Sequence, residues 1–438
     1  MPRGMSWPRI SRIWRANSGR DHAFGCGRVA RLRSCDERNG YEADSSDHIG
    51  CRMFRAARPP PAVSIAVPVR NEVERIGDCL GAFACQRAAP AFDVVLLLNG
   101  WDDGTQAAVA AFAPTMPFRL HAIERHLPPE QAGAGHARRL AFAEAARRAP
   151  GAVLMTTDAD ARVPADWIAR NLDALTRGAD AVAGRAVIDP VDALRIPQRL
   201  HDDDALECAY AALLDEIASI IDPDPADPWP RHDEHSGASF AVTAAAWKAV
   251  GGIPAVALGE DRAFFQALRR IDARIRHDPA IRVIVSGRIE GRAAGGMADT
   301  MRRRMERPDE MLDDRLEPAR AASRRAQIRA ELREMWESGD VAGRDMARRL
   351  GFNPARLTEM LSQPFFGAAW DSVEAASPML RFVPVPASAV RAETRVAEGC
   401  LAVLRTTQSA ASRSSRHRGA RRAATGLRDA APMKQDAA

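Results

Sequence analysis

The nine residues AVLMTTDAD, Ala152–Asp160, join a short apolar run to two aspartates one residue apart. An apolar run of this length is typical of a strand buried on both faces of a sheet. Both carboxylates would then follow the carboxyl end of that strand, where open α/β sheets bind their ligands. Two hard oxygen ligands at this edge favour a divalent cation shared with phosphate oxygens.

The Asp-x-Asp spacing is weak evidence by itself, because it occurs three times in the chain. Asp202 and Asp204 lie in the acidic start of a predicted helix, and Asp222 and Asp224 lie in a proline-rich loop. Only the first pair directly follows a strand-like run.

Strand-like and helix-like segments alternate along the chain from Ala62. The runs VSIAVPV, FDVVLLL, FRLHAIE and AVLMTT are each followed by a predicted helix, over 74–85, 103–112, 134–149 and 165–176. This order predicts an α/β fold with a Rossmann-type, mostly parallel sheet covered by helices on both faces. Helical patterns also fill residues 300–405, which we expect to form a C-terminal helical extension.

Four segments follow from these patterns. We expect residues 1–58 to be a disordered or mis-assigned extension, with the physiological start near Met53, and 59–299 to be the α/β domain. The helical extension covers 300–405, and 406–438 is expected to be a disordered basic tail, because its composition falls to Ser, Arg and Ala.

Composition excludes several classes of protein. No run reaches the roughly 18 apolar residues of a membrane span. The seven cysteines show no Cys-x2-Cys pair, which argues against a zinc or disulfide framework and favours the cytoplasm. Arginine crowds both termini, so contact with an anionic membrane face or with nucleic acid stays open, although a solvated tail is the preferred interpretation.

Two other predicted strands are followed by polar or glycine-rich loops. After the first strand, Asn71 and Glu72 reach the ligand edge of the sheet, unless Asn71 simply caps the next helix. The loop GAGHARR, Gly133–Arg139, opens a helix and combines free N–H groups with arginine, which favours an anion.

Five elements in this order, PVRNE, NGWDDGT, GAGHARR, TTDAD and GEDRAFF, resemble family 2 of the inverting, nucleotide-sugar-dependent GT-A glycosyltransferases. The resemblance runs from Val63 to Gly296. It implies a GT-A-like fold, Mg²⁺ or Mn²⁺ as cofactor with Asp158 and Asp160 as ligands, and a hydroxyl acceptor. The positions that it assigns to nucleotide-sugar binding are Pro68, Asn71, Glu72, Asn99, Gly135, Arg138 and Asp158. Asn99 stands where such enzymes usually have an aspartate, so the choice of nucleotide stays open.

The pair Glu260-Asp261 matches the family's Glu-Asp motif, which implies that Asp261 is the general base. A hydroxyl is a poor nucleophile until a carboxylate takes its proton, so the chemistry requires such a group. The alternative is two acids that favour the first turn of a helix.

The resemblance places His235, Ser236 and Gly237 on the acceptor side. His232 and His235 as a metal pair is the less favoured alternative. Many relatives supply a histidine as a further metal ligand after the last strand, but the segment VSGRIEGR, Val285–Arg292, contains none.

The sequence therefore predicts a non-processive, metal-assisted transfer of one sugar, because the Gln-x-x-Arg-Trp motif of processive members is missing. Two alternatives stay open. One is a nucleotidyltransferase on a related scaffold, and the other is a binding protein whose segment 345–361 forms a helix-turn-helix. We favour an ordinary helix pair there, which covers the domain, shapes the acceptor site or forms a homodimer. Nucleic acid is not the expected partner, and peripheral contact with the inner membrane face stays open.

Overall fold

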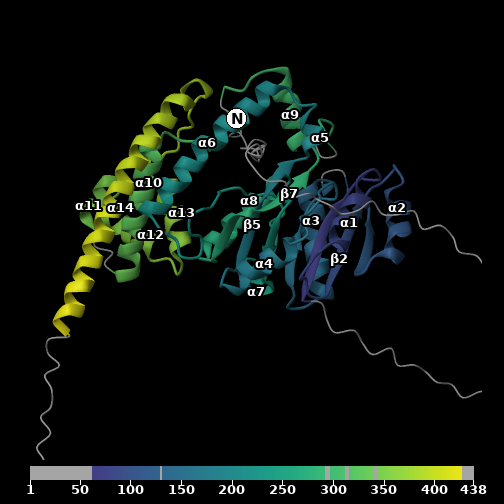
Figure 1. The fold of residues 1–438 in the computed structure, drawn as a ribbon, viewed down its shortest axis with the longest axis horizontal. Coiled ribbons are helices and arrows are strands. Elements are labelled where there is room, and N and C mark those ends of the chain that lie inside the picture. The colour runs from purple at the N-terminus through teal and green to yellow at the C-terminus, as the bar shows by residue number, and fades with distance from the viewer. Residues whose placement is uncertain (1–61, 129–130, 292–295, 311–314, 340–342, 427–438) are drawn as a thin grey trace, which may run out of the picture.

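A computed structural model describes residues 62–128, 131–291, 296–310, 315–339 and 343–426 (Figure 1). Its centre is a seven-stranded sheet with the order β3-β2-β1-β4-β6-β5-β7. The strands are β1 Val63–Val69, β2 Phe92–Asn99, β3 Arg119–Arg125, β4 Val153–Thr156, β5 Ala181–Ile188, β6 Phe240–Val242 and β7 Ile275–Val285. Strand β6 runs antiparallel to β4 and β5, and the pairs β1–β2, β2–β3, β1–β4 and β5–β7 are parallel.

Helices surround this sheet and extend beyond it. Those that follow the strands of the domain are α1 Ile76–Ala84, α2 Thr105–Phe112, α3 Ala134–Arg148, α4 Trp167–Thr176, α5 Pro190–Ala193, α6 Gln198–Ile221, α7 Ala244–Ala249 and α8 Glu260–Arg270. The remaining helices are α9 Met297–Glu306, α10 Ala319–Ser338, α11 Arg344–Leu350, α12 Pro354–Leu361, α13 Phe366–Ala376 and α14 Val390–Gly426.

Each face of the sheet has its own hydrophobic core. Successive side chains of a strand point to opposite faces, so Ile65 of β1 joins the core under α1 and α4, and Ala66 joins the core under α3 and α8. Both residues are fully buried. The prediction of a mostly parallel α/β sheet with helices on both faces is confirmed.

Two element boundaries differ from the sequence prediction. The apolar pattern predicts a helix over 203–221 and a strand over 282–288. In the structure, helix α6 begins five residues earlier, at Gln198, and β7 covers Ile275–Val285. The first part of β7 contains Arg276, His277 and Asp278, whose polar side chains hide a strand from the apolar pattern. Pairing with β5, interrupted by an irregularity between Ala183 and Arg185, defines the strand instead.

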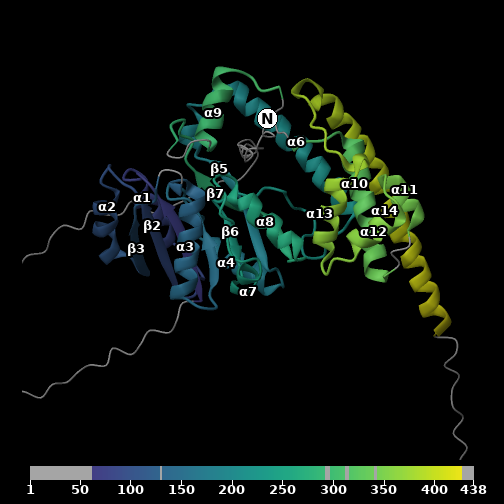
Figure 2. The ribbon, with the colours of Figure 1, turned by 180° about the vertical axis from the view of Figure 1, so that it is seen from behind.

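The C-terminal helices form two further clusters (Figure 2). Helices α10 to α13 share a core that includes Leu332 and Trp370. Helices α6, α10 and α14 share another, in which the Tyr210 hydroxyl donates a hydrogen bond to the Glu317 carbonyl at 2.7 Å. Segment 345–361 contains two helices, α11 and α12, whose Leu350 and Leu357 are buried in the first of these clusters.

Helix α14 continues to Gly426 and so enters the segment from residue 406 for which we expect a disordered tail. Alanine and arginine are strong helix formers, so a polar composition here does not prevent a helix. Residues 1–58, the hypothesis about Met53, and residues 427–438 lie outside the described residues.

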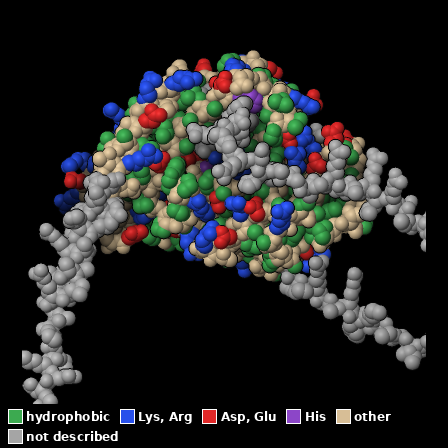
Figure 3. Space-filling model, in the orientation of Figure 1, with side chains coloured by type: hydrophobic (Ala, Val, Ile, Leu, Met, Phe, Trp, Pro, Cys, Tyr) green, Lys and Arg blue, Asp and Glu red, His purple; other side chains and the backbone are tan. Residues whose placement is uncertain are grey.

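The surface and the helices bear on the expected partners. Among the described residues, no helix is long and apolar enough to cross a membrane. Basic and acidic side chains are interspersed on the face shown in Figure 3. Membrane contact and a homodimer stay predictions.

Candidate active site

The order of the strands creates the position of the site. From β1 the chain proceeds outward through β2 to β3, and then returns to place β4 on the other side of β1. Loops leaving β1 and β4 therefore diverge, which opens a crevice at their carboxyl ends. A cavity of about 290 Å³ lies there. Its volume is close to the lower end of the range for sites that bind small molecules.

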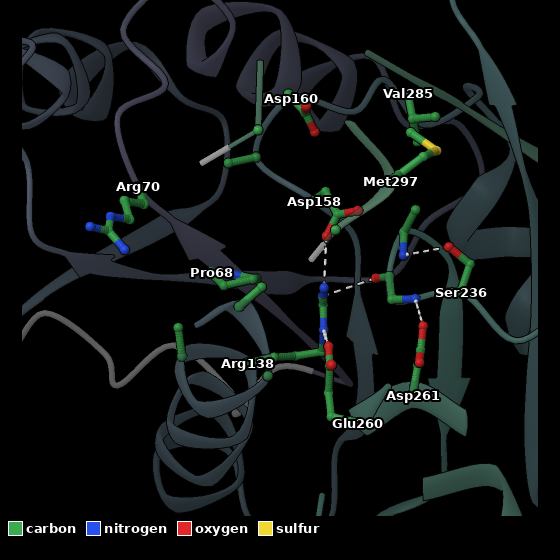
Figure 4. A pocket seen from close by; sticks show the side chains of 18 of the residues that line it. Pro68, Arg70, Arg138, Asp158, Asp160, Ser236, Glu260, Asp261, Val285 and Met297 are labelled. Carbon is green, nitrogen blue, oxygen red and sulfur yellow. Dashed lines mark hydrogen bonds and ion pairs between the residues drawn. The ribbon is translucent and has the colours of Figure 1, made fainter. Parts of the chain in front are cut away.

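Most of the predicted residues line this cavity (Figure 4). They come from the ends of β1, β2 and β4, the start of α3, the loop before β6 and the start of α8. The predicted residues that line it are Pro68, Glu72, Asn99, Gly135, Arg138, Asp158, Asp160, Ser236, Gly237, Glu260 and Asp261.

Arg138 connects the two halves of the site. Its Nη2 donates to Asp158 Oδ1 at 2.7 Å and its Nε to Glu260 Oε1 at 3.0 Å, and Nη1 donates to the Gly237 carbonyl at 2.9 Å. Burial lowers the pKa of Arg138, but the charges of the two carboxylates outweigh this and raise it above its ordinary value. With 3% of its side chain exposed, Arg138 is an internal support of the cavity wall.

The base candidate Asp261 is held by backbone N–H groups. Gly237 N donates to Asp261 Oδ2 at 2.9 Å, and Arg262 N donates to Oδ1 at 2.7 Å. Burial, together with the neighbouring Glu260, raises the pKa of Asp261 to about 6. A carboxylate with a pKa near neutrality and a fixed orientation suits the acceptance of a proton.

The glycine at position 135 permits close packing against α8. A Cβ atom there would lie 3.0 Å from Glu260 Oε2 and 3.0 Å from the Val256 carbonyl oxygen. The pattern GAGHARR predicts that the backbone of this loop approaches a phosphate. In the structure, Gly135 leaves room for the Glu-Asp segment at the start of α8.

Arg288 is a residue of the site that the sequence analysis did not single out. It follows β7, and its Nη1 and Nη2 donate to Glu72 Oε2 and Oε1 at 2.7 and 2.6 Å. Its Nη2 also lies 3.1 Å from Asp160 Oδ2. Burial raises the pKa of Asp160 to about 7, although Arg288 acts in the opposite direction. The sequence offered one sign of this role: Arg288 lies in the segment Val285–Arg292, where related enzymes have a metal-binding histidine.

Two predicted residues do not line the cavity. Asn71 has a left-handed backbone, with φ of 52°, and its side chain bonds to Asp102 of the neighbouring loop. It does not cap α1 either, because that helix begins after Arg75.

His235 is buried on the other side of the loop before β6. Its Nε2 lies 3.0 Å from Nε2 of His277, whose Nδ1 lies 2.7 Å from Asp227 Oδ2. Burial and the adjacent Arg269 hold the pKa of His235 well below its usual value, so the imidazole is neutral. The alternative of a metal pair with His232 gains no support, because the part of the chain that the structure describes contains no cluster of three or more metal-ligating side chains.

Part of this chain resembles known proteins. A profile described as glycosyl transferase family 2 matches residues 64–227. These residues form a glycosyltransferase family 2 domain. The matched range includes Asp158 and Asp160 and ends before Asp261 and Arg288.

Two curated relatives match the domain. Glycosyltransferase AglE of Haloferax volcanii is 29% identical over 126 residues, which cover 28% of this chain and 39% of AglE. Polyprenol monophosphomannose synthase of Mycolicibacterium smegmatis is 31% identical over 127 residues, which cover 29% of this chain and 46% of the synthase. The matches thus span less than half the length of either relative.

Solved structures were also compared with the family 2 domain and its extension. The mannosyltransferase PcManGT from Pyrobaculum calidifontis, in complex with GDP-Man and Mn²⁺, is 20% identical, covers 79% of this chain and 85% of its own, and gives a TM-score of 0.37. S. aureus TarS 1-349, in complex with UDP-GlcNAc, is 16% identical, covers 80% and 92%, and gives a TM-score of 0.39.

Proposed function

We propose that this chain transfers one sugar from a nucleoside diphosphate sugar to a hydroxyl acceptor, with inversion and without processivity. The observation that carries the proposal is Asp261, a carboxylate fixed by two backbone N–H groups on the wall of a cavity that also contains Asp158 and Asp160. Membership of residues 64–227 in the glycosyltransferase family supports the donor class.

The proposed reaction assigns one task to each side of the cavity. The nucleotide lies over the ends of β1 and β4, with its diphosphate towards Asp158 and Asp160. The acceptor hydroxyl approaches beside Ser236 and Gly237 and loses its proton to Asp261 as its oxygen bonds to the anomeric carbon. The bond from that carbon to the phosphate oxygen breaks on the opposite face, which inverts the configuration and leaves a nucleoside diphosphate.

Arg138 and Glu260 position these groups and do not contact substrate in the proposal. Arg138 fixes Asp158 on the donor side, and Glu260 accepts from the same guanidinium beside the base. The donor side and the base side of the cavity therefore keep a fixed position relative to each other before substrate binds. Such a fixed arrangement lowers the barrier, because the reacting groups need not be oriented during the reaction.

The expected Mg²⁺ or Mn²⁺ is not well matched by the side chains at the site. Asp158 Oδ1 accepts from Arg138, and Asp160 Oδ2 forms an ion pair with Arg288, so one oxygen of each carboxylate already has a cationic partner. Outside the gaps at 129–130, 292–295, 311–314 and 340–342, residues 62–426 contain no group of three His, Cys, Asp or Glu suited to a metal ion. We assign no step of the proposed reaction to a metal ion.

Two measurements test the proposed function. Thermal unfolding is followed with UDP, GDP, dTDP and CDP, each with EDTA or with Mn²⁺, and one nucleotide should raise the midpoint. A ligand at a hundred times its dissociation constant adds about 2.7 kcal/mol to the stability. A donor sugar of that nucleotide is then incubated with the protein, and nucleoside diphosphate should be released.

The rival functions give other products. Release of pyrophosphate would indicate a nucleotidyltransferase. No stabilisation by any of the four nucleotides, with or without Mn²⁺, would refute the transferase and favour a binding protein. The variant Asp261→Asn controls for contaminating activity, because it should bind nucleotide but release nucleoside diphosphate from the donor at least about a hundredfold more slowly.

A further inference from the structure

The leaving group of the proposed reaction needs a cation. As the bond to the anomeric carbon breaks, negative charge develops on the nucleoside diphosphate, and a fixed positive group lowers the barrier by stabilising that charge. In a water-poor crevice such a group has a larger effect than in bulk water. The inference below rests on the proposed function and concerns which group supplies this charge.

Arg288 is the cation beside Asp160. It donates two hydrogen bonds to Glu72 and lies 3.1 Å from the Asp160 carboxylate, at the edge of the cavity expected to receive the diphosphate. Its side chain is 23% exposed and lines the cavity. A guanidinium carries five N–H donors and matches phosphate oxygens in pairs.

The backbone that carries Arg288 is fixed. The N–H group of Gly287 donates to Asp192 Oδ2 at 2.9 Å, and that carboxylate also pairs with Arg75 at the start of α1. On the opposite side, Glu72 is held because its N–H group lies 2.8 Å from Thr105 Oγ1. The guanidinium is therefore preorganised, and its position does not depend on a bound ligand.

Arg138, another arginine that lines the cavity, is already occupied. Arg138 is 3% exposed and divides its donors among Glu260, Asp158, Thr156 and the Gly237 carbonyl. If Arg138 turned towards a phosphate, it would lose several of these hydrogen bonds. Arg288 already donates hydrogen bonds at the edge of the cavity, so it can donate to a phosphate there without leaving its position.

We propose that Arg288 binds the diphosphate of the donor and stabilises the leaving nucleoside diphosphate in place of a divalent cation, and that Glu72 is its positioning residue. The anomeric carbon gains the acceptor oxygen, the proton goes to Asp261, and the electron pair of the broken bond stays on the phosphate oxygen next to Arg288. Donor binding by this protein is accordingly independent of metal.

Calorimetric titration of the full chain in excess EDTA tests the assignment. UDP, GDP, dTDP and CDP are the probes, each compared with its nucleoside. The wild type should bind one diphosphate in EDTA, and Arg288→Gln should weaken that binding about tenfold to a hundredfold, the range for a lost charge-assisted hydrogen bond. Nucleoside binding should change by less than about twofold, because the arginine acts on phosphate.

Three companion variants separate charge from folding. Arg288→Lys keeps the charge and should retain diphosphate binding in EDTA, which gives a readout if Arg288→Gln fails to fold. Arg282→Gln, at an exposed position on the same strand, should bind as the wild type does. Arg288→His places a metal ligand beside Asp160 and should make diphosphate binding require Mn²⁺.

The role of Glu72 is tested through Arg288. Glu72→Gln should weaken diphosphate binding and leave nucleoside binding unchanged. In the double variant with Arg288→Gln, the loss should be no larger than that of Arg288→Gln alone, since Glu72 acts only through the arginine.

The outcomes distinguish the two proposals. Wild-type binding that requires Mn²⁺, or diphosphate binding that Arg288→Gln leaves unchanged, would overturn the assignment of Arg288 while the transferase stands. Failure of all four diphosphates to bind, in EDTA and in Mn²⁺, would overturn the transferase and this inference together.

Discussion

Arg138 and Glu260 are 122 residues apart in the chain, yet the arginine Nε lies 3.0 Å from Oε1 of the glutamate. The same guanidinium holds Asp158 at 2.7 Å, so one buried side chain connects the end of β4 with the start of α8. The donor side and the base side of the cavity therefore share a single support.

Replacement of that support should destabilise the fold. Arg138→Met leaves the largely buried Glu260 without its partner, and the loss of one member of a buried pair costs about 3 to 5 kcal/mol. Urea unfolding measures the change. The control is Arg139→Met, one residue later on the exposed side of α3, where a change within about 0.5 kcal/mol is expected.

A side chain at Gly237 should disturb the same support from the other direction. A Cβ atom there would lie 2.6 Å from Cζ of Arg138, which cannot retreat because its donors are all directed to fixed partners. We expect Gly237→Ala to lose about 1 to 3 kcal/mol of stability and most of the activity. In Gly81→Ala, where nothing lies within 4 Å of the new Cβ, stability should be unchanged or slightly higher.

Removal of the base should separate chemistry from binding. Asp261→Asn preserves the size of the side chain and an acceptor for the Gly237 N–H group but cannot take a proton. Release of nucleoside diphosphate from the donor should fall by about 10² to 10⁴. The dissociation constant of the nucleoside diphosphate should stay within about threefold; a rate near that of the wild type would assign the base elsewhere.

The rate should depend on pH through the same carboxyl group. Its pKa is about 6, above the usual value, so folding favours the protonated form, and the form that accepts a proton predominates only above pH 6. Below that value kcat/KM should fall about tenfold per pH unit, and above it the profile should level. A profile that stays flat down to pH 5 would contradict the assignment of Asp261.

The sequence predicted those parts of the molecule that depend on local pattern. Buried parallel strands are continuous apolar runs, so β1, β2 and β4 were recognisable, and polar groups directly after them had to share one edge of the sheet. Asp158 and Asp160 reached the cavity for this reason, whereas Asp261 lies in the first turn of α8 and was predicted from the resemblance to the Glu-Asp motif.

Contacts between distant segments were not predictable in this way. The ion pair of Arg288 with Glu72 joins residues 216 positions apart, and the sequence contains no period or spacing that relates them. His235 was assigned to the acceptor side because it precedes Gly237, but its partner His277 lies on β7 and draws the ring into the interior. Polar residues in a strand therefore explain why the sequence predicted neither the start of β7 nor the buried position of His235.

Helix α6 has a practical consequence for anyone who produces this protein. Its residues Tyr210 and Ile217 are fully buried, and the side chains that cover them come from the far end of the chain, among them Val390 and Leu401 of α14. A protein that is truncated after residue 299 would expose this apolar face of α6 to water, and we expect it to aggregate. The smallest piece worth expressing therefore extends past Leu401, even for experiments that concern only the nucleotide.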